Sequence, residues 1–152
     1  MFKDITTLLN NPTAFRKAVD LLARKFKDER IDQVVGIESR GFIFGSALAY
    51  KLKAGFVPVR KKGKLPYKTK SVSYELEYGT DTLEIHKDAI PPGSRVLIVD
   101  DLLATGGTVK AATRLMKGFK AEIRGVAFLV ELTFLKGKEK LGGIPVYSII
   151  EY

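Results

Sequence analysis

Val96-Leu-Ile-Val-Asp-Asp-Leu-Leu-Ala-Thr-Gly-Gly-Thr108 gives the clearest indication of fold and function in this chain. Its first four residues predict a buried strand with Asp100 and Asp101 at the carboxyl end. A Thr/Gly-rich turn follows, and apolar residues then recur at helical spacing from Val109 to Phe119. A helix entered through such a turn can bind an anion, because its first N–H groups lack partners and its dipole favours negative charge. The pattern therefore predicts an anion site at this turn.

The side chains around the turn indicate which anion would bind. Gly106 and Gly107 allow the backbone to approach a ligand closely, and the hydroxyl of Thr105 adds a donor. The acids Asp100 and Asp101 would repel a phosphate at the same place and suit a polyol or a hydrated metal ion beside it. We expect both acids to lie at a polar strand end, where neutralising them leaves nothing buried unsatisfied. A phosphate next to sugar hydroxyls indicates a sugar phosphate, and a plain strand–helix connector is the alternative.

The rest of the chain alternates predicted helices and strands. This alternation predicts an α/β fold with a mostly parallel sheet, helices on both faces and ligands at the carboxyl ends of the strands. Polar residues occur at those expected ends, namely 38–40, 60–62, 100–101 and Glu131. We predict helices at 12–27, 42–52, 109–119 and 135–141, strands at 31–37, 56–60, 96–99, 122–132 and 146–150, a basic loop at 61–70, and a hairpin of segments 71–77 and 82–86.

Composition limits the class of protein. A chain of 152 residues, 45% hydrophobic and 28% charged, fits one globular domain. It has no cysteine, which excludes disulfides and thiolate metal sites, and we expect a cytoplasmic protein. No apolar run reaches the roughly 18–20 residues of a membrane span, so no membrane partner is expected.

The net charge of +9 could indicate a nucleic-acid surface or polyphosphate substrates. The basic residues are scattered, apart from one cluster at 60–64, and no basic stripe interleaved with aromatic residues is present. We therefore expect no nucleic acid partner and attribute the charge to phosphate-containing ligands and to solvated lysines.

The residues at 96–108 resemble the phosphoribosyl pyrophosphate motif of type I phosphoribosyltransferases. The resemblance runs from Phe2 to about Tyr152 and implies a type I phosphoribosyltransferase fold in one domain, 1–152, with a mobile β-hairpin lid. It implies purine salvage, in which phosphoribosyl pyrophosphate and adenine give AMP and pyrophosphate. Four further segments resemble the adenine phosphoribosyltransferase family, namely Gly36-Ile-Glu-Ser-Arg-Gly-Phe-Ile-Phe-Gly45, Val59-Arg-Lys-Lys-Gly-Lys-Leu-Pro66, Tyr74-Glu-Leu-Glu-Tyr-Gly79 and Val130-Glu-Leu-Thr133.

The resemblance also implies roles for residues that hold phosphoribosyl pyrophosphate. Asp100 and Asp101 would contact the ribose hydroxyls, directly or through magnesium-bound water, with Mg²⁺ carried by the substrate and no separate metal site on the protein. A loop at 39–41 would bind pyrophosphate, and in this family such loops often contain a non-proline cis peptide. The 5′-phosphate would bind Ala104, Thr105, Gly106, Gly107 and Thr108, and the pyrophosphate would bind Ser39, Arg40, Gly41, Lys61 and Lys64.

The same resemblance implies a base site and a reaction centre. Glu77 would handle base protons, Tyr78 would cover the reaction centre, and Arg60 would neutralise the leaving pyrophosphate. The family is typically a homodimer and normally has a further helical segment before Phe2, so we expect a truncated N-terminal hood. Two other functions stay open: a related purine phosphoribosyltransferase, and a non-catalytic regulator that senses phosphoribosyl pyrophosphate. The residues that would contact adenine are Phe2, Lys3, Leu102 and Leu103.

Overall fold

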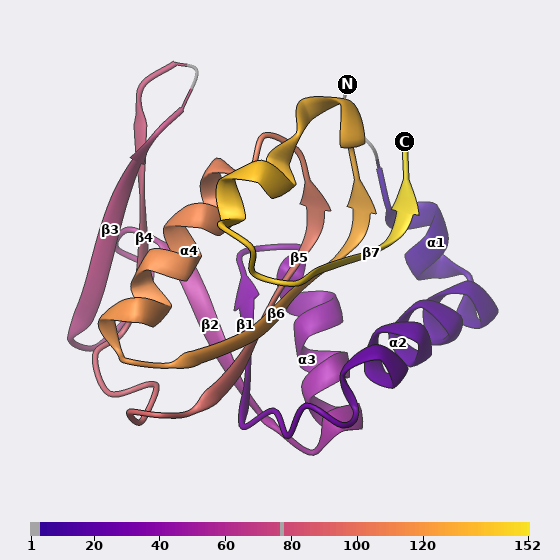
Figure 1. Cartoon of the computed structure of the whole chain (residues 1–152), viewed down its shortest axis with the longest axis horizontal. Coiled ribbons are helices and arrows are strands. Elements are labelled where there is room, and N and C mark those ends of the chain that lie inside the picture. Colours follow the sequence, from indigo (N-terminus) through magenta and orange to yellow (C-terminus); the bar gives the residue numbers. More distant parts are fainter. Residues whose placement is uncertain (1–3, 77) are drawn as a thin grey trace.

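A seven-stranded sheet runs through the centre of the protein in the order β3-β4-β2-β1-β5-β6-β7 (Figure 1). The computed structural model describes residues 4–76 and 78–152. Strands β2, β1, β5, β6 and β7 are parallel, whereas the hairpin β3–β4 joins antiparallel to the end of β2. This arrangement confirms the predicted α/β fold with a mostly parallel sheet.

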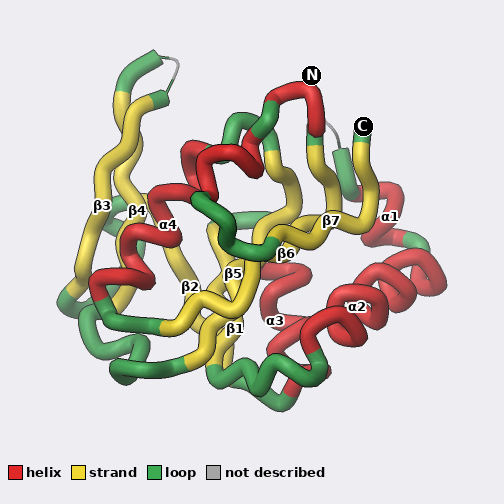
Figure 2. The backbone as a smooth tube through the Cα atoms, viewed as in Figure 1, coloured by secondary structure: helices red, strands yellow, loops and turns green. Residues whose placement is uncertain are grey.

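The helices cover both faces of the sheet, with α4 on one face and α2 and α3 on the other (Figure 2). The strands are β1 (Gln33–Ile37), β2 (Gly55–Lys61), β3 (Thr69–Glu75), β4 (Thr80–His86), β5 (Arg95–Leu103), β6 (Glu122–Glu131) and β7 (Val146–Glu151). The helices are α1 (Thr6–Asn10), α2 (Pro12–Phe26), α3 (Gly41–Leu52) and α4 (Gly107–Gly118), with 3₁₀ segments η1 (Thr133–Leu135) and η2 (Gly137–Leu141).

Each face of the sheet has its own apolar core. Val96 and Ile98 of β5 point into the core under α4, and Leu97 and Val99 point into the core under α2 and α3. All four side chains are fully buried, as expected for a central parallel strand covered on both sides. Burial on both faces fixes the register of β5, because a slip by one residue would exchange the two sets of side chains.

Helix α2 begins and packs as its sequence predicts. The side chain of Asn11 accepts a hydrogen bond from the backbone N–H of Ala14 at 3.0 Å, and Pro12 occupies the first helical turn. Its buried residues recur at helical spacing and face α3 and the sheet. They are Ala18, Val19, Leu22 and Phe26.

The structure corrects the predicted elements in three places. Strand β5 does not end before the acids but continues to Leu103, because β6 pairs with it as far as Glu131. The predicted helix at 135–141 is instead η1 and η2, separated by Lys136 in the left-handed region with φ 54°. Helix α1 had no counterpart in the sequence analysis. Among the residues that the structure describes, no helix is long and apolar enough to cross a membrane.

Candidate functional site

The carboxyl ends of β1, β2, β5 and β6 bring the predicted polar residues to one edge of the sheet. At this edge β5 passes into α4 through Ala104 and Thr105. Gly106 makes the turn with φ 89°, and α4 begins at the next residue. The first backbone bond of α4 runs from Lys110 N–H to the Gly106 carbonyl at 3.0 Å, so the N–H groups before Lys110 lie at the open end of the helix. The predicted anion-binding turn is therefore present in the geometry that exposes these donors.

A small cavity of about 90 Å³ lies inside this turn and is lined by Asp100 and residues 102–109. This volume holds several water molecules, because one water needs about 10–15 Å³ of such space. It suits a phosphate group and is too small for a whole nucleotide. With donors at the helix N-terminus and a phosphate-sized cavity, the turn meets the geometric requirements of an anion site.

The two adjacent acids have different environments, and the buried Asp101 corrects the expectation of a polar strand end where neutralising both acids leaves nothing buried unsatisfied. Asp101 is only 4% exposed, and its Oδ2 accepts a hydrogen bond from Arg40 Nε at 2.5 Å. Asp100 lines the phosphate-sized cavity instead, and its Oδ1 accepts from the backbone N–H of Asp101 at 2.8 Å. Burial, and then the neighbouring charge of Asp101, raise the pKa of Asp100 well above its usual value. Asp100 would be stabilised by a cation or hydroxyl donors, whereas Asp101 already holds an arginine.

The loop between β1 and α3 contains a cis peptide bond between Glu38 and Ser39, as the family resemblance implied. Arg40 follows at the start of α3, and its side chain is 41% exposed while paired with Asp101. Gly41 packs closely on β5, because a Cβ there would lie 2.9 Å from the Val99 carbonyl oxygen. The predicted pyrophosphate loop is thus held next to the acid pair of β5.

Glu38 gathers the predicted basic residues at the end of β2. Its carboxylate forms ion pairs with Lys64 Nζ and, at 3.4 Å, with Arg60 Nε, and it accepts from the Lys61 backbone N–H at 2.8 Å. Burial raises the pKa of Glu38, but the hydrogen bonds from Lys64 and Lys61 and the charges of Lys64 and Arg60 outweigh it, so the pKa is lowered overall. Glu38 therefore stays ionised and acts as a counterion for the basic residues at the end of β2.

Tyr74 connects the hairpin to the anion-binding turn, a role that the sequence analysis missed. Its hydroxyl accepts hydrogen bonds from Lys61 Nζ at 3.2 Å and from Thr108 Oγ1 at 3.4 Å, and it lies 3.5 Å from Asp81 Oδ2. Lys61 also forms an ion pair with Asp81. The available signal was the alternation of Val72 and Tyr74 along β3, which turns both side chains toward the core under α4.

Some predicted site residues are placed differently from the expectation. Leu103 is only 1% exposed and packs in the core under α4, so its side chain is not available to a base, while Leu102 is half-buried and faces the other core. Tyr78 is 89% exposed in the turn that joins β3 to β4. Three predicted residues lie outside the described part of the chain: Phe2, Lys3 and Glu77.

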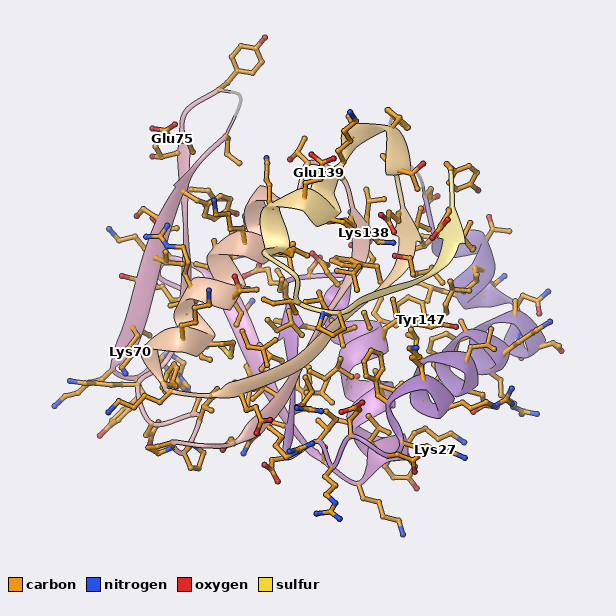
Figure 3. All side chains as sticks on the ribbon, in the orientation of Figure 1. Lys27, Lys70, Glu75, Lys138, Glu139 and Tyr147 are labelled. Atoms are coloured by element: carbon orange, nitrogen blue, oxygen red, sulfur yellow. The ribbon has the colours of Figure 1, made fainter. Side chains whose placement is uncertain are left out.

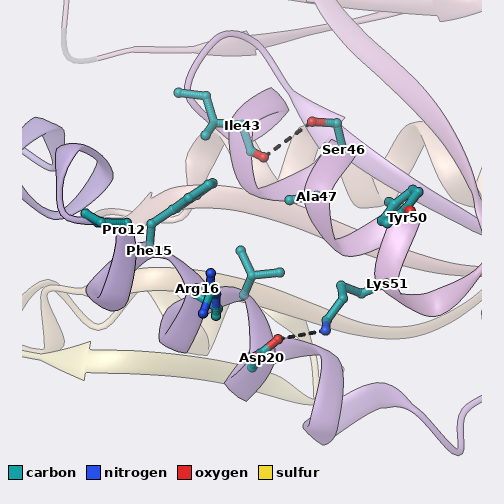
Figure 4. A pocket seen from close by; sticks show the side chains of 10 residues that line it. Pro12, Phe15, Arg16, Asp20, Ile43, Ser46, Ala47, Tyr50 and Lys51 are labelled. Atoms are coloured by element: carbon teal, nitrogen blue, oxygen red, sulfur yellow. Dashed lines mark hydrogen bonds and ion pairs between the residues drawn. The ribbon is translucent and has the colours of Figure 1, made fainter.

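A larger groove of about 680 Å³ lies between α2 and α3, away from the anion-binding turn (Figure 4). Phe15, Ile43 and Tyr50 line it, and the last two side chains are 38% and 86% exposed. A Lys51–Asp20 ion pair at 3.0 Å lies at one side of the groove. An exposed apolar surface with charged residues at its margin is typical of a protein–protein contact.

Comparison with known proteins identifies relatives across the whole chain. Residues 4–141 match the phosphoribosyl transferase domain family. The adenine phosphoribosyltransferase of Acidobacterium capsulatum is 57% identical over 152 residues, which cover 100% of this chain and 84% of the relative. Among solved structures, the adenine phosphoribosyltransferase of Thermoanaerobacter pseudethanolicus superposes with a TM-score of 0.96 at 52% identity, covering 99% of this chain and 88% of the other.

A second solved structure is that of the adenine phosphoribosyltransferase of Saccharomyces cerevisiae in complex with an imino-altritol 1,6-bisphosphate and adenine. It has a TM-score of 0.91 at 47% identity and covers 97% of this chain and 86% of the yeast chain. The similarity to both structures extends over nearly the entire length of the protein.

The different environments of the two acids predict opposite effects on stability. Because the pKa of Asp100 is raised, folding favours its protonated form; this contribution is present below the usual carboxyl pKa of about 3.9 and is lost as the pH rises through the folded pKa. Asp100→Asn should therefore keep or increase the free energy of unfolding at pH 7, with less gain at pH 4. Urea denaturation at both pH values measures this difference.

Asp101→Asn is the matched control, since it removes the charge that faces Arg40. It should lower the free energy of unfolding by about 1 kcal/mol at pH 7, a modest value because the arginine is partly exposed. Equal destabilisation by both variants would show that the two acids do not differ as the geometry indicates.

Proposed function

The chain belongs to the adenine phosphoribosyltransferase branch of the phosphoribosyl transferase family, and from that premise we propose how its site performs the reaction. Adenine and phosphoribosyl pyrophosphate are converted to AMP and pyrophosphate, a step of purine salvage. The single observation that supports this assignment of the site most strongly is the phosphate-sized cavity at the start of α4 with Asp100 beside it. One end of that arrangement suits the 5′-phosphate and the other suits the sugar.

The phosphoribosyl group is held between the turn and the acids in this proposal. Ala104–Thr108 bind the 5′-phosphate through backbone N–H groups and the hydroxyls of Thr105 and Thr108. Asp100 accepts hydrogen bonds from the ribose hydroxyls, which offset the burial of its carboxylate. Asp101 has a different role from the one expected from the sequence. It holds Arg40 in position for the pyrophosphate and does not contact the sugar.

Arg40, Arg60 and the lysines at 61 and 64 bind the pyrophosphate in this proposal. In the structure the carboxylates of Glu38, Asp81 and Asp101 form ion pairs with these cations at the same edge of the sheet. A polyanionic substrate would exchange places with part of that set. The cations are then already in position when the substrate arrives, and the carboxylates give way to its phosphate oxygens.

Mg²⁺ is proposed to enter with phosphoribosyl pyrophosphate. The available protein donors fit this arrangement, since Mg²⁺ usually takes one or two carboxylates together with substrate phosphates and waters, and Asp100 lies next to the phosphate-sized cavity. Among the described residues, no group of three or more metal-binding side chains is present. When bound, the ion would neutralise charge on the leaving pyrophosphate.

The reaction requires positioning and charge stabilisation more than covalent chemistry on the protein. The bond from C1 of the ribose to the pyrophosphate oxygen breaks as N9 of adenine bonds to C1, and N9 loses its proton. The leaving pyrophosphate keeps the electron pair of the broken bond, and Arg40 and Arg60 disperse its charge. By resemblance, Glu77 handles the base proton, while the β3–β4 hairpin closes as a lid so that Tyr78 excludes water. Leu102 and the backbone of Leu103 border the base in this proposal, and the roles of Phe2 and Lys3 in the base site rest on the family resemblance alone.

We expect the protein to select adenine as the base, and an assay of pyrophosphate release tests this selectivity. With phosphoribosyl pyrophosphate and Mg²⁺ present, we expect turnover with adenine to exceed that with guanine, hypoxanthine and xanthine by about 100-fold or more. A site that hydrogen-bonds an exocyclic amine leaves polar groups unpaired against an oxopurine. Chelation of the divalent cation should abolish turnover with adenine as well.

The same assay separates the alternatives. Equal or greater turnover with an oxopurine would indicate a related purine phosphoribosyltransferase. Tight binding of phosphoribosyl pyrophosphate without pyrophosphate release from any base would indicate a regulator that only senses this metabolite.

The protein is further proposed to form a homodimer through the groove between α2 and α3. This groove presents exposed Ile43 and Tyr50, and α3 continues from it to the pyrophosphate loop. Sedimentation at micromolar concentration should therefore give a dimer. Tyr50→Glu should shift it toward monomer, because the substitution places a charge in an apolar contact, whereas Phe134→Glu, which changes another exposed aromatic residue, should not. A dimer that withstands Tyr50→Glu would place the contact elsewhere.

A further inference from the structure

Glu131 is a buried carboxylate at the carboxyl end of β6 to which the mechanism assigns no role. It is only 3% exposed, and its Oε2 accepts a hydrogen bond from Ser148 Oγ at 2.9 Å. Lys138 Nζ lies 3.2 Å from the same oxygen and forms the ion pair. Figure 3 shows Lys138 near the ends of β6 and β7, on the segment that crosses above this edge of the sheet. A buried charge is retained at a cost unless it is paired, so this carboxylate depends on Lys138.

Lys138 follows Gly137, which packs directly on the anion-binding turn. A Cβ at Gly137 would lie 2.5 Å from the Ala104 carbonyl oxygen and 2.8 Å from Leu103 Cδ1. In the opposite direction, a Cβ at Gly106 would lie 2.7 Å from the Gly137 carbonyl oxygen. The two glycines therefore bring backbone against backbone, and a shift of η2 would shift the turn with it.

The segment that contains Gly137 is anchored at three places. At its start, Thr133 donates from its N–H at 2.9 Å and from its hydroxyl at 2.6 Å to the Tyr152 carbonyl. At its end, Leu141 is 3% exposed and packs in the core under α4. The Glu131–Lys138 ion pair lies between these anchors, one residue from the contact with the turn.

We propose that Glu131 is a positioning residue for the 5′-phosphate: by holding Lys138, its carboxylate keeps Gly137 against the turn and fixes the N–H groups of Ala104–Thr108. Preorganised donors bind an anion well only when the groups behind them are themselves fixed. This inference rests on the proposed function, because it takes the turn as the phosphate site. It predicts an effect confined to ligands that have a 5′-phosphate.

The variants Glu131→Gln and Lys138→Met test the proposal, and Lys140→Met is the matched control. Lys140→Met removes the same charge from the same exposed segment. Calorimetry of AMP binding should give a Kd about tenfold higher for both variants, since a displacement of about 1 Å can cost up to about 100-fold. The KM for phosphoribosyl pyrophosphate should rise to a similar extent, while the KM for adenine and the Kd for pyrophosphate should not change. The double variant should lose little more than either single one, because the two residues act as one unit.

A merely structural role would give a different result. It would lower Tm while leaving the Kd for AMP unchanged, or weaken adenine and AMP binding alike, and either outcome would overturn the proposal. If Lys138→Met fails to fold because the buried Glu131 carboxylate has lost its partner, Glu131→Gln decides, because it buries no charge and leaves a lysine whose side chain is 46% exposed. Failure of the proposed function itself is distinguishable, since the unsubstituted protein would then neither bind AMP nor release pyrophosphate with adenine.

Discussion

The site depends on one constraint. The N-terminus of α4 must be open to a ligand, although the strand that leads into it, β5, is buried on both faces. Strand β5 runs between the two cores, so it can turn into α4 only at the edge of the sheet. Gly106 makes this turn with φ 89°, a backbone conformation that residues with a side chain rarely adopt. Because Gly137 packs on it, the turn is fixed from behind while its N–H groups remain open in front. The same geometry places Asp100 beside the cavity, where burial and the neighbouring charge of Asp101 raise the pKa of its carboxyl.

The second organising feature is the pairing of charges along the carboxyl edge. The basic residues that would hold pyrophosphate are each opposed by a carboxylate: Arg40 by Asp101, Lys61 by Asp81, and both Lys64 and Arg60 by Glu38. Because the cation of each pair is at least a third exposed, these pairs contribute modestly to stability, and their main effect is to keep the cations in place before substrate arrives. A protein of net charge +9 can in this way concentrate positive groups at one edge without leaving them all to repel one another.

Much of this arrangement could be predicted from local patterns. The buried strand, the glycine turn, the helix after it and the mostly parallel sheet all follow from residues close together in the sequence. The different roles of Asp100 and Asp101 could not be predicted in this way. Strand β5 continues past them because it pairs with β6, and Asp101 contacts Arg40, which lies in a distant part of the sequence. The roles of Tyr74 and Gly137 were not predicted for the same reason, since each acts through contacts with residues far away in the sequence. The burial of Leu103 likewise depends on the packing of α4 and η2.

The central claim is that the backbone at the start of α4 binds the 5′-phosphate. A crystal structure of the protein with AMP tests it most directly, because AMP has that phosphate and lacks the pyrophosphate. The account predicts phosphate oxygens at about 2.7–3.2 Å from the backbone nitrogens of Gly106–Thr108, with the ribose hydroxyls directed toward Asp100. A phosphate bound instead at Arg40 or at the basic residues around Glu38, with the turn at α4 empty, would contradict it.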